Sequence, residues 1–406
     1  MNNFSAFDPL TAKQTADTEV AVNALKREIR NILSSYVGWY DPFCELIQNS
    51  LDSVEEKNRL EIESSREYSP KINIHIDILN NRLTVTDNGV GLDENKFKQF
   101  LAPCFSFKSG SRYRGHKGVG ATYLAYGFNS IQICTKTDDY SAIGKMVGAR
   151  NWLEDDAPAG NPVIKPDDLE SYDKCFYENE TGVSISVLFD GKTHPKSLDW
   201  IKADTANKWK TILLVKTGLG AFFKNEKILV KINVTSKDGI LTTEEFQGAE
   251  YFWPHQIYNK TLTLRDISKQ VDSLYNKGGL DARIPSRLRE IECIYDTLPK
   301  DEISKYIILN EKELDLIEKL DPTFHFSYMY TAKIWGAFNE SLDIRKNHHI
   351  LLPGVQICAN NMPQGEVIQI PLNRNIGRQN QISVVVHFNN SSPDMGRKGF
   401  QSEVVE

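Results

Sequence analysis

The sequence predicts an α+β protein, because helical and strand patterns follow one another in its first half. Apolar residues from Phe43 to Leu51 recur at the spacing of one helix face. Apolar and polar residues then alternate with a period of two across 71–87, as in a pair of strands. A glycine-rich stretch at 115–120 leads into a helix-like run at 121–126. These three segments carry the residues of a candidate site.

The first segment is a helix with a polar edge. Glu45 and Asn49 lie four residues apart, and Asp52 lies three residues further on. Residues three and four apart share one face of a helix, so the three side chains project together. An ordinary amphipathic helix with a solvated polar edge has the same pattern, so this segment alone does not indicate a site.

The second segment is a β-hairpin whose second strand ends in a carboxylate. The turn falls at Asn80 and Asn81, and the strand runs into Asp87, followed by Gly89 and Gly91. A carboxylate can accept a hydrogen bond from the exocyclic amine of adenine. Glycines let a planar ligand approach the backbone closely. A plain Asp-Asn-Gly turn is the alternative, since such turns are common in hairpins.

The third segment places Gly115, Gly118 and Gly120 just before a helix. Glycines that lead into a helix N-terminus expose backbone N–H groups that suit phosphate oxygens. Their spacing is three then two, the reverse of the dinucleotide-binding pattern. A Walker-type phosphate loop is absent as well, because no Gly-Lys-Ser/Thr follows the glycines.

In this order and spacing, the three segments resemble the N box and the two glycine boxes of the GHKL superfamily. That superfamily contains gyrase, heat-shock chaperones, histidine kinases and MutL-type ATPases. The Lys-Ser-Gly at 108–110 and the strand-like run at 131–136 are most similar to the heat-shock chaperone and MORC branches. The resemblance covers about residues 20–190. It implies a Bergerat-type fold, which is a two-layer α/β sandwich that binds ATP.

The resemblance also implies a role for each polar residue. Glu45 would be the general base that activates water, and Asn49 would ligate the Mg²⁺ that bridges the phosphates. Asp52 would lie near the nucleotide, Asp87 would bind the adenine amine, and Gly91 would line the base pocket. ATP and Mg²⁺ are the implied cofactors. The other residues assigned to the nucleotide are Gly89, Lys108, Ser109, Gly115, Gly118, Val119 and Gly120.

One position departs from the family pattern. Relatives usually have Gly-Thr on the last strand of the ATPase fold, near the adenine, but Val183 follows Gly182 here. Thr181 or Ser184 would have to substitute, or a water would be held differently. The departure bears on the adenine contacts and leaves the phosphate chemistry unaffected.

The rest of the chain resembles the transducer domain of the superfamily, which has a β/α ribosomal-protein-like fold. In relatives a transducer lysine reaches the γ-phosphate from a loop after the last long strand. Lys398 is the candidate here, with Arg397 second, and a surface lysine is the alternative. The predicted organisation is an ATP-binding domain at 1–195 with an N-terminal strap at 1–30 and a lid at 107–120, then a transducer-like domain at 196–406 with a helical insertion at about 263–320.

Secondary structure outside the three segments is expected as follows. An irregular insertion precedes the last strand of the first domain, and a helix opens the second domain before a series of strands. The insertion spans 138–179, the helix 198–214, and the strands 227–234, 326–335, 354–359, 367–371 and 382–388.

Composition is that of an ordinary globular chain, with 406 residues, 40% hydrophobic and 25% charged. The net charge of −6 does not favour a dedicated nucleic-acid binder, although local basic patches would suffice for one. No apolar run is long enough to cross a membrane, and the polar N-terminus lacks a signal region, so we expect a cytoplasmic location. The six cysteines form no CxxC and favour buried free thiols.

The sequence therefore favours a Mg²⁺-dependent ATPase whose nucleotide state controls a conformational or dimeric clamp, with a homodimer forming on ATP binding. A MORC-like role on DNA in a bacterial defence system is one use of such a clamp. A chaperone-like clamp on a protein partner is a second hypothesis. A nucleotide-gated binding module with negligible turnover is a third, against which Glu45 argues.

Overall fold

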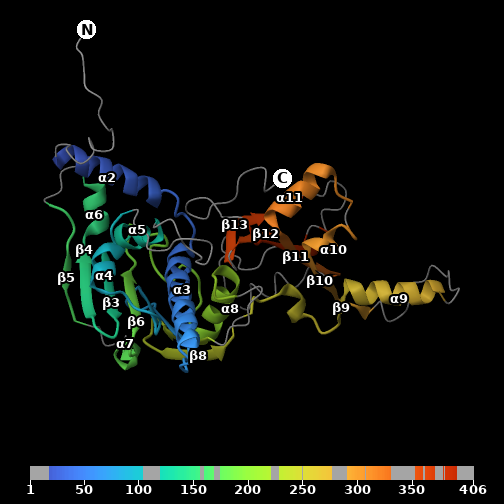
Figure 1. The fold of residues 1–406 in the computed structure, drawn as a ribbon, viewed down its shortest axis with the longest axis horizontal. Helices are drawn as coiled ribbons and strands as arrows, with labels where there is room; N and C mark the ends of the chain where they lie inside the picture. The colour runs from blue at the N-terminus through green and yellow to red at the C-terminus, as the bar shows by residue number, and fades with distance from the viewer. Residues whose placement is uncertain are drawn as a thin grey trace, which may run out of the picture.

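The structure is a computed structural model built around two β-sheets (Figure 1). In the ribbon view, the elements of the first sheet lie to the left and those of the second to the right. The residues described are 18–103, 119–155, 160–168, 174–220, 228–248, 250–276, 290–306, 308–330, 353–359, 362–370, 378 and 380–390.

The first sheet has eight strands in the order β5-β4-β3-β6-β2-β1-β7-β8. All neighbours pair antiparallel except β1 and β7, which are parallel. The strands are β1 (Lys71–Asp77), β2 (Arg82–Asp87), β3 (Ser130–Lys136), β4 (Ser141–Val147), β5 (Ile164–Pro166), β6 (Gly182–Leu188), β7 (Leu229–Thr235) and β8 (Leu241–Gln247).

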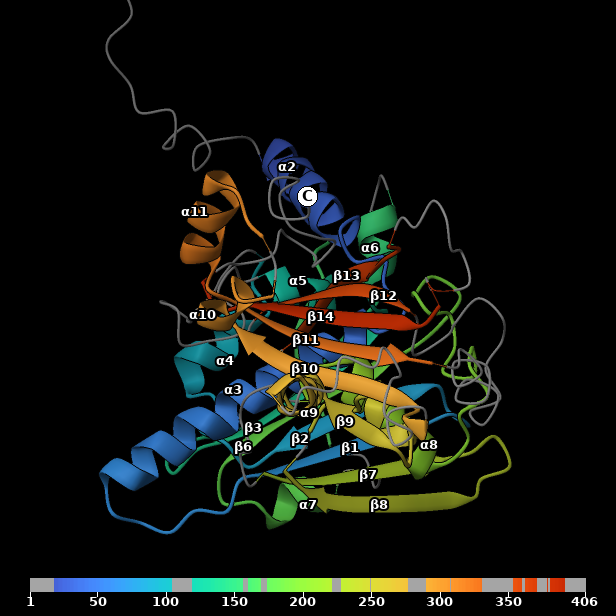
Figure 2. The same cartoon turned by 90° about the vertical axis from the view of Figure 1, so that its right-hand side faces the viewer.

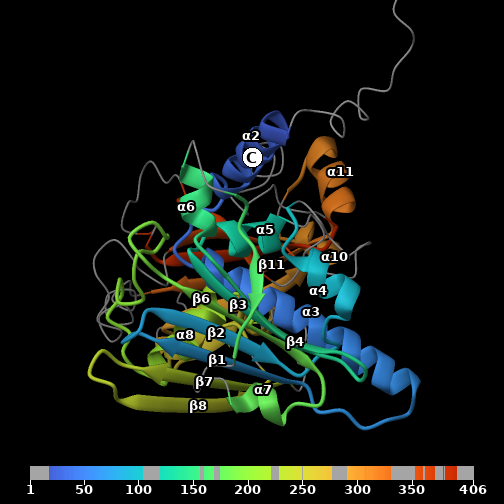
Figure 3. The ribbon, with the colours of Figure 1, turned by 90° about the vertical axis from the view of Figure 1, so that its left-hand side faces the viewer.

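Helices cover this sheet and share one apolar core with it. The longest, α3, packs across β1, β2 and β6 (Figure 3). Period-two alternation turns Ile72, Ile74 and Ile76 toward that core, where each is at most 1% exposed. The helices of this part are α2 (Thr18–Leu33), α3 (Asp41–Glu63), α4 (Glu94–Phe100), α5 (Val119–Tyr126), α6 (Ala149–Glu154), α7 (Lys174–Glu178) and α8 (Ala206–Lys216).

The second sheet has six strands in the order β13-β12-β14-β11-β10-β9 and faces the viewer in Figure 2. Leu316 and Leu320 of its helix α11 pack on one face of the sheet. Its strands are β9 (Thr261–Thr263), β10 (Cys293–Pro299), β11 (Pro322–Met329), β12 (Gly354–Ala359), β13 (Met362–Ile368) and β14 (Ile382–Phe388), and its helices are α9 (Leu264–Asn276), α10 (Lys300–Ile303) and α11 (Glu311–Leu320).

The two parts of the structure meet where β13 approaches α3 and α8. Met362 at the start of β13 is 1% exposed and lies against Gly218, close to Leu51 of α3. The Cys44 thiol of α3 donates a hydrogen bond to the carbonyl of Lys216 at the end of α8, at 3.2 Å. Residues of the second sheet thereby join the core of the first.

The α+β class is confirmed, and the local patterns near the site gave the correct elements. The hairpin is β1 and β2, paired from Ile72 with Asp87 to Asp77 with Arg82. The glycine-rich stretch leads into α5, and the strand expected at 131–136 is β3.

Three expectations about the remaining elements are corrected. The insertion at 138–179 is not irregular, because it contains β4, which pairs with β3 along its whole length, as well as β5 and two short helices. The expected helix at 198–214 begins only at Ala206. The helical insertion at 263–320 contains β10, which lies between β11 and β9 in the second sheet. These strands are fixed by pairing with neighbouring strands, β4 with β3 and β10 with β11 and β9, which the composition of each segment alone does not report.

The strand expected at 227–234 also lies elsewhere than predicted. This strand is predicted to belong to the second domain, but β7 pairs in parallel with β1, and β8 follows it at the sheet edge. The first sheet therefore continues to Gln247, beyond the predicted boundary at 195. Helix α8, which precedes β7 in the chain, packs on β7 and β8.

Among the described residues, no helix has both the length and the apolar character needed to cross a bilayer. The five cysteines in these ranges are free thiols, and four of them are buried, as expected.

Candidate functional site

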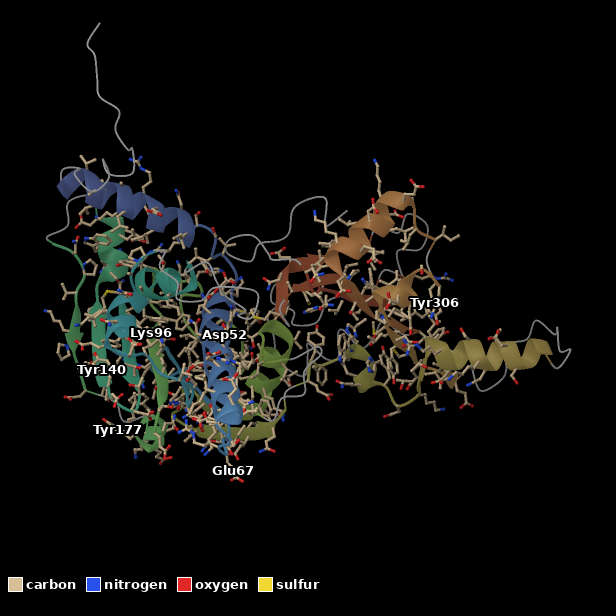
Figure 4. All side chains as sticks on the ribbon, viewed as in Figure 1. Asp52, Glu67, Lys96, Tyr140, Tyr177 and Tyr306 are labelled. Carbon is tan, nitrogen blue, oxygen red and sulfur yellow. The ribbon has the colours of Figure 1, made fainter. Side chains whose placement is uncertain are left out.

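The candidate site is organised by α3, which brings the three sequence segments together. The helix starts at Asp41 with Pro42 in its first turn, a position where proline's missing N–H has no helical partner to lose. Its first half is almost wholly buried and includes charged residues, among them Glu45 and Asp52. Figure 4 labels Asp52 on α3.

Glu45 joins the first segment to the third. Its side chain is 6% exposed, and its Oε1 accepts a hydrogen bond from the Tyr36 hydroxyl at 3.1 Å. A Cβ at Gly120, in the first turn of α5, would overlap Oε2 of the same carboxylate. The carboxylate therefore lies directly beside the backbone at the start of α5, and only glycine leaves room for it there.

Asp87 joins the first segment to the second. This carboxylate is 3% exposed at the end of β2, and its Oδ1 accepts hydrogen bonds from the Ser53 hydroxyl at 3.0 Å and the Gly89 N–H at 2.9 Å. Burial raises the pKa of Asp87 to about 6, because a desolvated carboxylate is disfavoured. The hydrogen bonds from Gly89 and Ser53 oppose that rise.

The glycines around Asp87 are required by contacts within the protein. A Cβ at Gly89 would overlap Ser53 of α3, and a Cβ at Gly91, where φ is +70°, would overlap the Lys136 carbonyl. At Gly182, where φ is +142°, a Cβ would overlap the Asp87 carbonyl. The space beside these three backbones is filled by α3, β3 and the Asp87 turn, whereas the sequence analysis explained Gly89 and Gly91 by the approach of a ligand.

The structure also shows the contacts of Thr181 and Ser184, the two candidate substitutes near the departure from the family pattern at Val183. Thr181 donates a hydrogen bond to the Gly89 carbonyl at 2.6 Å and accepts one from the Lys57 ammonium at 2.6 Å. Ser184 accepts a hydrogen bond from the Thr86 hydroxyl at 2.8 Å. Of the two candidate substitutes, Thr181 thus contacts the Asp87-Asn88-Gly89 turn, and Ser184 contacts β2 one residue before Asp87.

Asn49 and Asp52 lie on the same helix as Glu45. Asn49 is half-buried and Asp52 is 3% exposed. Within the described ranges, no three His, Cys, Asp or Glu side chains are grouped as a metal site. Mg²⁺ at nucleotide sites is usually bound by one or two protein oxygens together with phosphate and water oxygens. The amide oxygen of Asn49 is a ligand of that kind.

Several predicted site residues lie outside the described ranges. These are Lys108, Ser109, Gly115, Gly118 and, in the second part, Lys398 with Arg397. Val119 and Gly120 are described and form the start of α5. Ser53 and Tyr36 were not among the predicted site residues. Ser53 lies four residues after Asn49 and therefore shares its helix face, so its place on the site edge was predictable, whereas nothing local marks Tyr36.

Comparison with known families agrees with this geometry. Residues 42–154 match the model of the family described as histidine kinase-, DNA gyrase B-, and HSP90-like ATPase. The matched range contains α3, the hairpin and the start of α5, which are the elements that meet at Glu45 and Asp87. This part of the chain is therefore similar to the ATPase domains of the GHKL superfamily. The comparison with curated proteins gives no match.

The surroundings of Asp87 predict how its carboxyl group titrates. Carbon-detected NMR of the aspartate side chains should show it with a pKa near 6. Ser53→Ala removes a donor that favours the charged form, so it should raise that pKa further. Exposed Asp93 is the control: the Lys96 N–H donates to it and lowers its pKa, and Ser53→Ala should leave it unchanged. An unchanged Asp87 titration in Ser53→Ala would contradict this account.

Proposed function

We propose that the protein binds Mg-ATP and hydrolyses it, and that the nucleotide state controls a conformational or dimeric clamp. One observation carries the proposal. Two buried carboxylates lie along α3: Glu45 belongs to the helix and lies beside Gly120, and Asp87, at the end of β2, accepts a hydrogen bond from Ser53 of the same helix. The match of residues 42–154 to GHKL-type ATPases supports the same chemistry.

Asp87 is proposed to accept a hydrogen bond from the adenine amine. Only the deprotonated carboxylate is a full acceptor at both oxygens. Because the pKa of Asp87 is about 6, the group is mostly charged at neutral pH and becomes protonated as the pH falls through 6. Nucleotide affinity should therefore be high above pH 6 and decrease below it.

Glu45 is proposed to act as the general base, and Asn49 to hold Mg²⁺. Hydrolysis needs one carboxylate that takes a proton from the attacking water, while most of the remaining stabilisation comes from charges around the phosphates. The metal would supply part of that positive charge. Asp52, on the same helix edge, is proposed to lie near the nucleotide.

The lid and the transducer cation remain predictions from the resemblance, since 107–118 and Lys398 lie outside the described residues. The strap is partly described: residues 18–30 belong to α2, which packs on α5 and α6 of its own chain. Met362 of the second sheet contacts Gly218 and lies close to Leu51 of α3. This contact supports communication between the nucleotide site and the second sheet, because a shift of α3 would alter the contact.

The proposal has three alternatives, which differ in what the clamp acts on and in whether ATP is turned over. A MORC-like action on DNA, in bacterial defence for example, and a chaperone-like grip on a protein both fit a nucleotide-controlled dimer. A binding module with negligible turnover fits if the site is completed only by a partner. The presence of Glu45 beside Gly120 favours turnover over this last alternative.

Glu45→Ala should retain ATP binding but lower turnover by about 100-fold or more, the scale of losing a positioned base. Phosphate release measures turnover, and calorimetry measures binding. Glu56→Ala, about three turns further along the same helix where Glu56 pairs with Arg59, is the matched control and should hydrolyse ATP normally. Undiminished hydrolysis by Glu45→Ala would end the assignment of the base.

Asp87→Asn and Asn49→Ala should weaken nucleotide binding in different ways. Asp87→Asn acts through adenine, so it should affect ADP as much as ATP and remove the loss of affinity between pH 7 and pH 5. Asn49→Ala acts through the metal, so it should weaken binding only when Mg²⁺ is present. Calorimetry with both nucleotides, with and without Mg²⁺, separates them. Normal ADP binding by Asp87→Asn would refute the adenine contact.

The clamp is tested by measuring the size of the protein with different nucleotides and its ATP hydrolysis with and without DNA. A non-hydrolysable ATP analogue should convert the protein to a dimer, measured by light scattering, and ADP should not. Stimulation of ATP hydrolysis by duplex DNA would favour the MORC-like alternative, and dimerisation without any response to DNA would favour a clamp on protein. A protein that remains the same size with every nucleotide does not close as a dimer.

A further inference from the structure

Tyr36 contacts the proposed base from outside all three motifs. It lies between the end of α2 and the start of α3 and is 6% exposed, as is Glu45. Its hydroxyl donates to Glu45 Oε1 at 3.1 Å across nine residues of sequence. A neutral donor on a buried carboxylate both lessens the cost of burying the charge and fixes one of its two oxygens.

The ring of Tyr36 is held as firmly as its hydroxyl. It stacks on Tyr123 of α5, with the ring centroids 4.1 Å apart and the planes 7° from parallel. Tyr123 is itself 6% exposed and lies one helical turn after Gly120. The helix that approaches Glu45 through Gly120 therefore also orients, through Tyr123, the residue that hydrogen-bonds to Glu45.

The two oxygens of Glu45 consequently have different surroundings. Oε1 accepts from Tyr36, and Oε2 is the oxygen nearest to the position of a Gly120 Cβ. Rotation of the carboxylate would exchange them, and it would break the hydrogen bond to Tyr36. The start of α5, toward which Oε2 is turned, is where the glycine-rich segment ends and where phosphates are expected.

The geometry points to Tyr36 as a positioning residue for ATP hydrolysis, which holds Glu45 Oε1 so that Oε2 takes the proton of the attacking water. This inference rests on the proposed function and deepens it. The proton moves from water to Oε2 while the water oxygen attacks the γ-phosphorus and the bond to the ADP oxygen breaks. Tyr36 keeps its own proton throughout.

The position of Tyr36 depends in turn on how α2 is anchored. In the middle of α2, the Lys26 ammonium donates to the Asp155 carbonyl at 2.5 Å and lies 4.7 Å from the ring centre of Trp152. Arg30 donates to the Leu153 carbonyl at 2.6 Å. These contacts fix α2 to the end of α6. Because Tyr36 follows α2, the anchoring of this helix sets the position of Tyr36, which orients the proposed base.

Tyr36→Phe tests the inference, because it keeps the ring and its stack and removes only the hydroxyl. Turnover should fall about tenfold, the effect of losing one hydrogen bond to a charged group, while ATP affinity stays within about twofold. The melting temperature should change little, since the packing is retained. Tyr126→Phe is the matched control: Tyr126 is on α5, like Tyr123, but packs on Trp152, and its variant should hydrolyse ATP normally.

A double-mutant cycle with Glu45→Ala separates positioning from a general structural effect. If Tyr36 acts through Glu45, Tyr36→Phe should not lower the residual single-turnover rate of Glu45→Ala any further. An equal loss in both backgrounds, a loss of ATP affinity with unchanged turnover, or wild-type turnover in Tyr36→Phe would each overturn the inference while leaving the proposed function intact. A wild-type protein that binds ATP without hydrolysing it would overturn both.

Discussion

The close packing of α3 against the end of β2 is the constraint on which the site depends. Gly89 lies so near Ser53 that no side chain fits between turn and helix, and the Ser53 hydroxyl donates to Asp87 across that contact. Gly182 allows the same turn to be approached from β6. Moving the turn outward by the width of one Cβ would separate Asp87 from its donor and expose it to water, which would remove the cause of its raised pKa.

The same physical problem recurs at Glu45. A carboxylate on the buried side of a helix is stable only if donors replace the water it loses. Tyr36 supplies one donor, and the backbone at the start of α5 is brought alongside by Gly120. At both carboxylates, a glycine allows backbone and helix to approach closely, and a hydroxyl group donates a hydrogen bond to the carboxylate. Stability of the fold and readiness of the site are therefore set by the same contacts.

Helix α3 also lies beside residues of the second sheet. Cys44 and Leu51, seven residues apart and on one side of the helix, contact the end of α8 and the neighbourhood of Met362. Glu45 projects to another side of the same helix. The candidate site and the second sheet therefore share one helix, α3, which carries Glu45 and also lies beside Met362.

The sequence itself determined the local elements around the site. Helical spacing placed Glu45, Asn49 and Asp52 on one helix, period-two alternation produced the hairpin that ends at Asp87, and glycines marked the start of α5. These signals are local, since each depends on residues within a turn or two of one another. Even Gly89 and Gly91 were recognised as important, although the contacts that require them are with Ser53 and Lys136.

Only the tertiary structure decided which distant residues meet. The pairing of β7 with β1, about 160 residues earlier in the chain, is a matter of register between strands, and the place of β10 between β11 and the edge strand β9 is of the same kind. The contact between Tyr36 and Glu45 depends on where α2 ends and where α5 packs. No periodicity encodes such contacts, because they arise from how complete elements bury their apolar faces against one another.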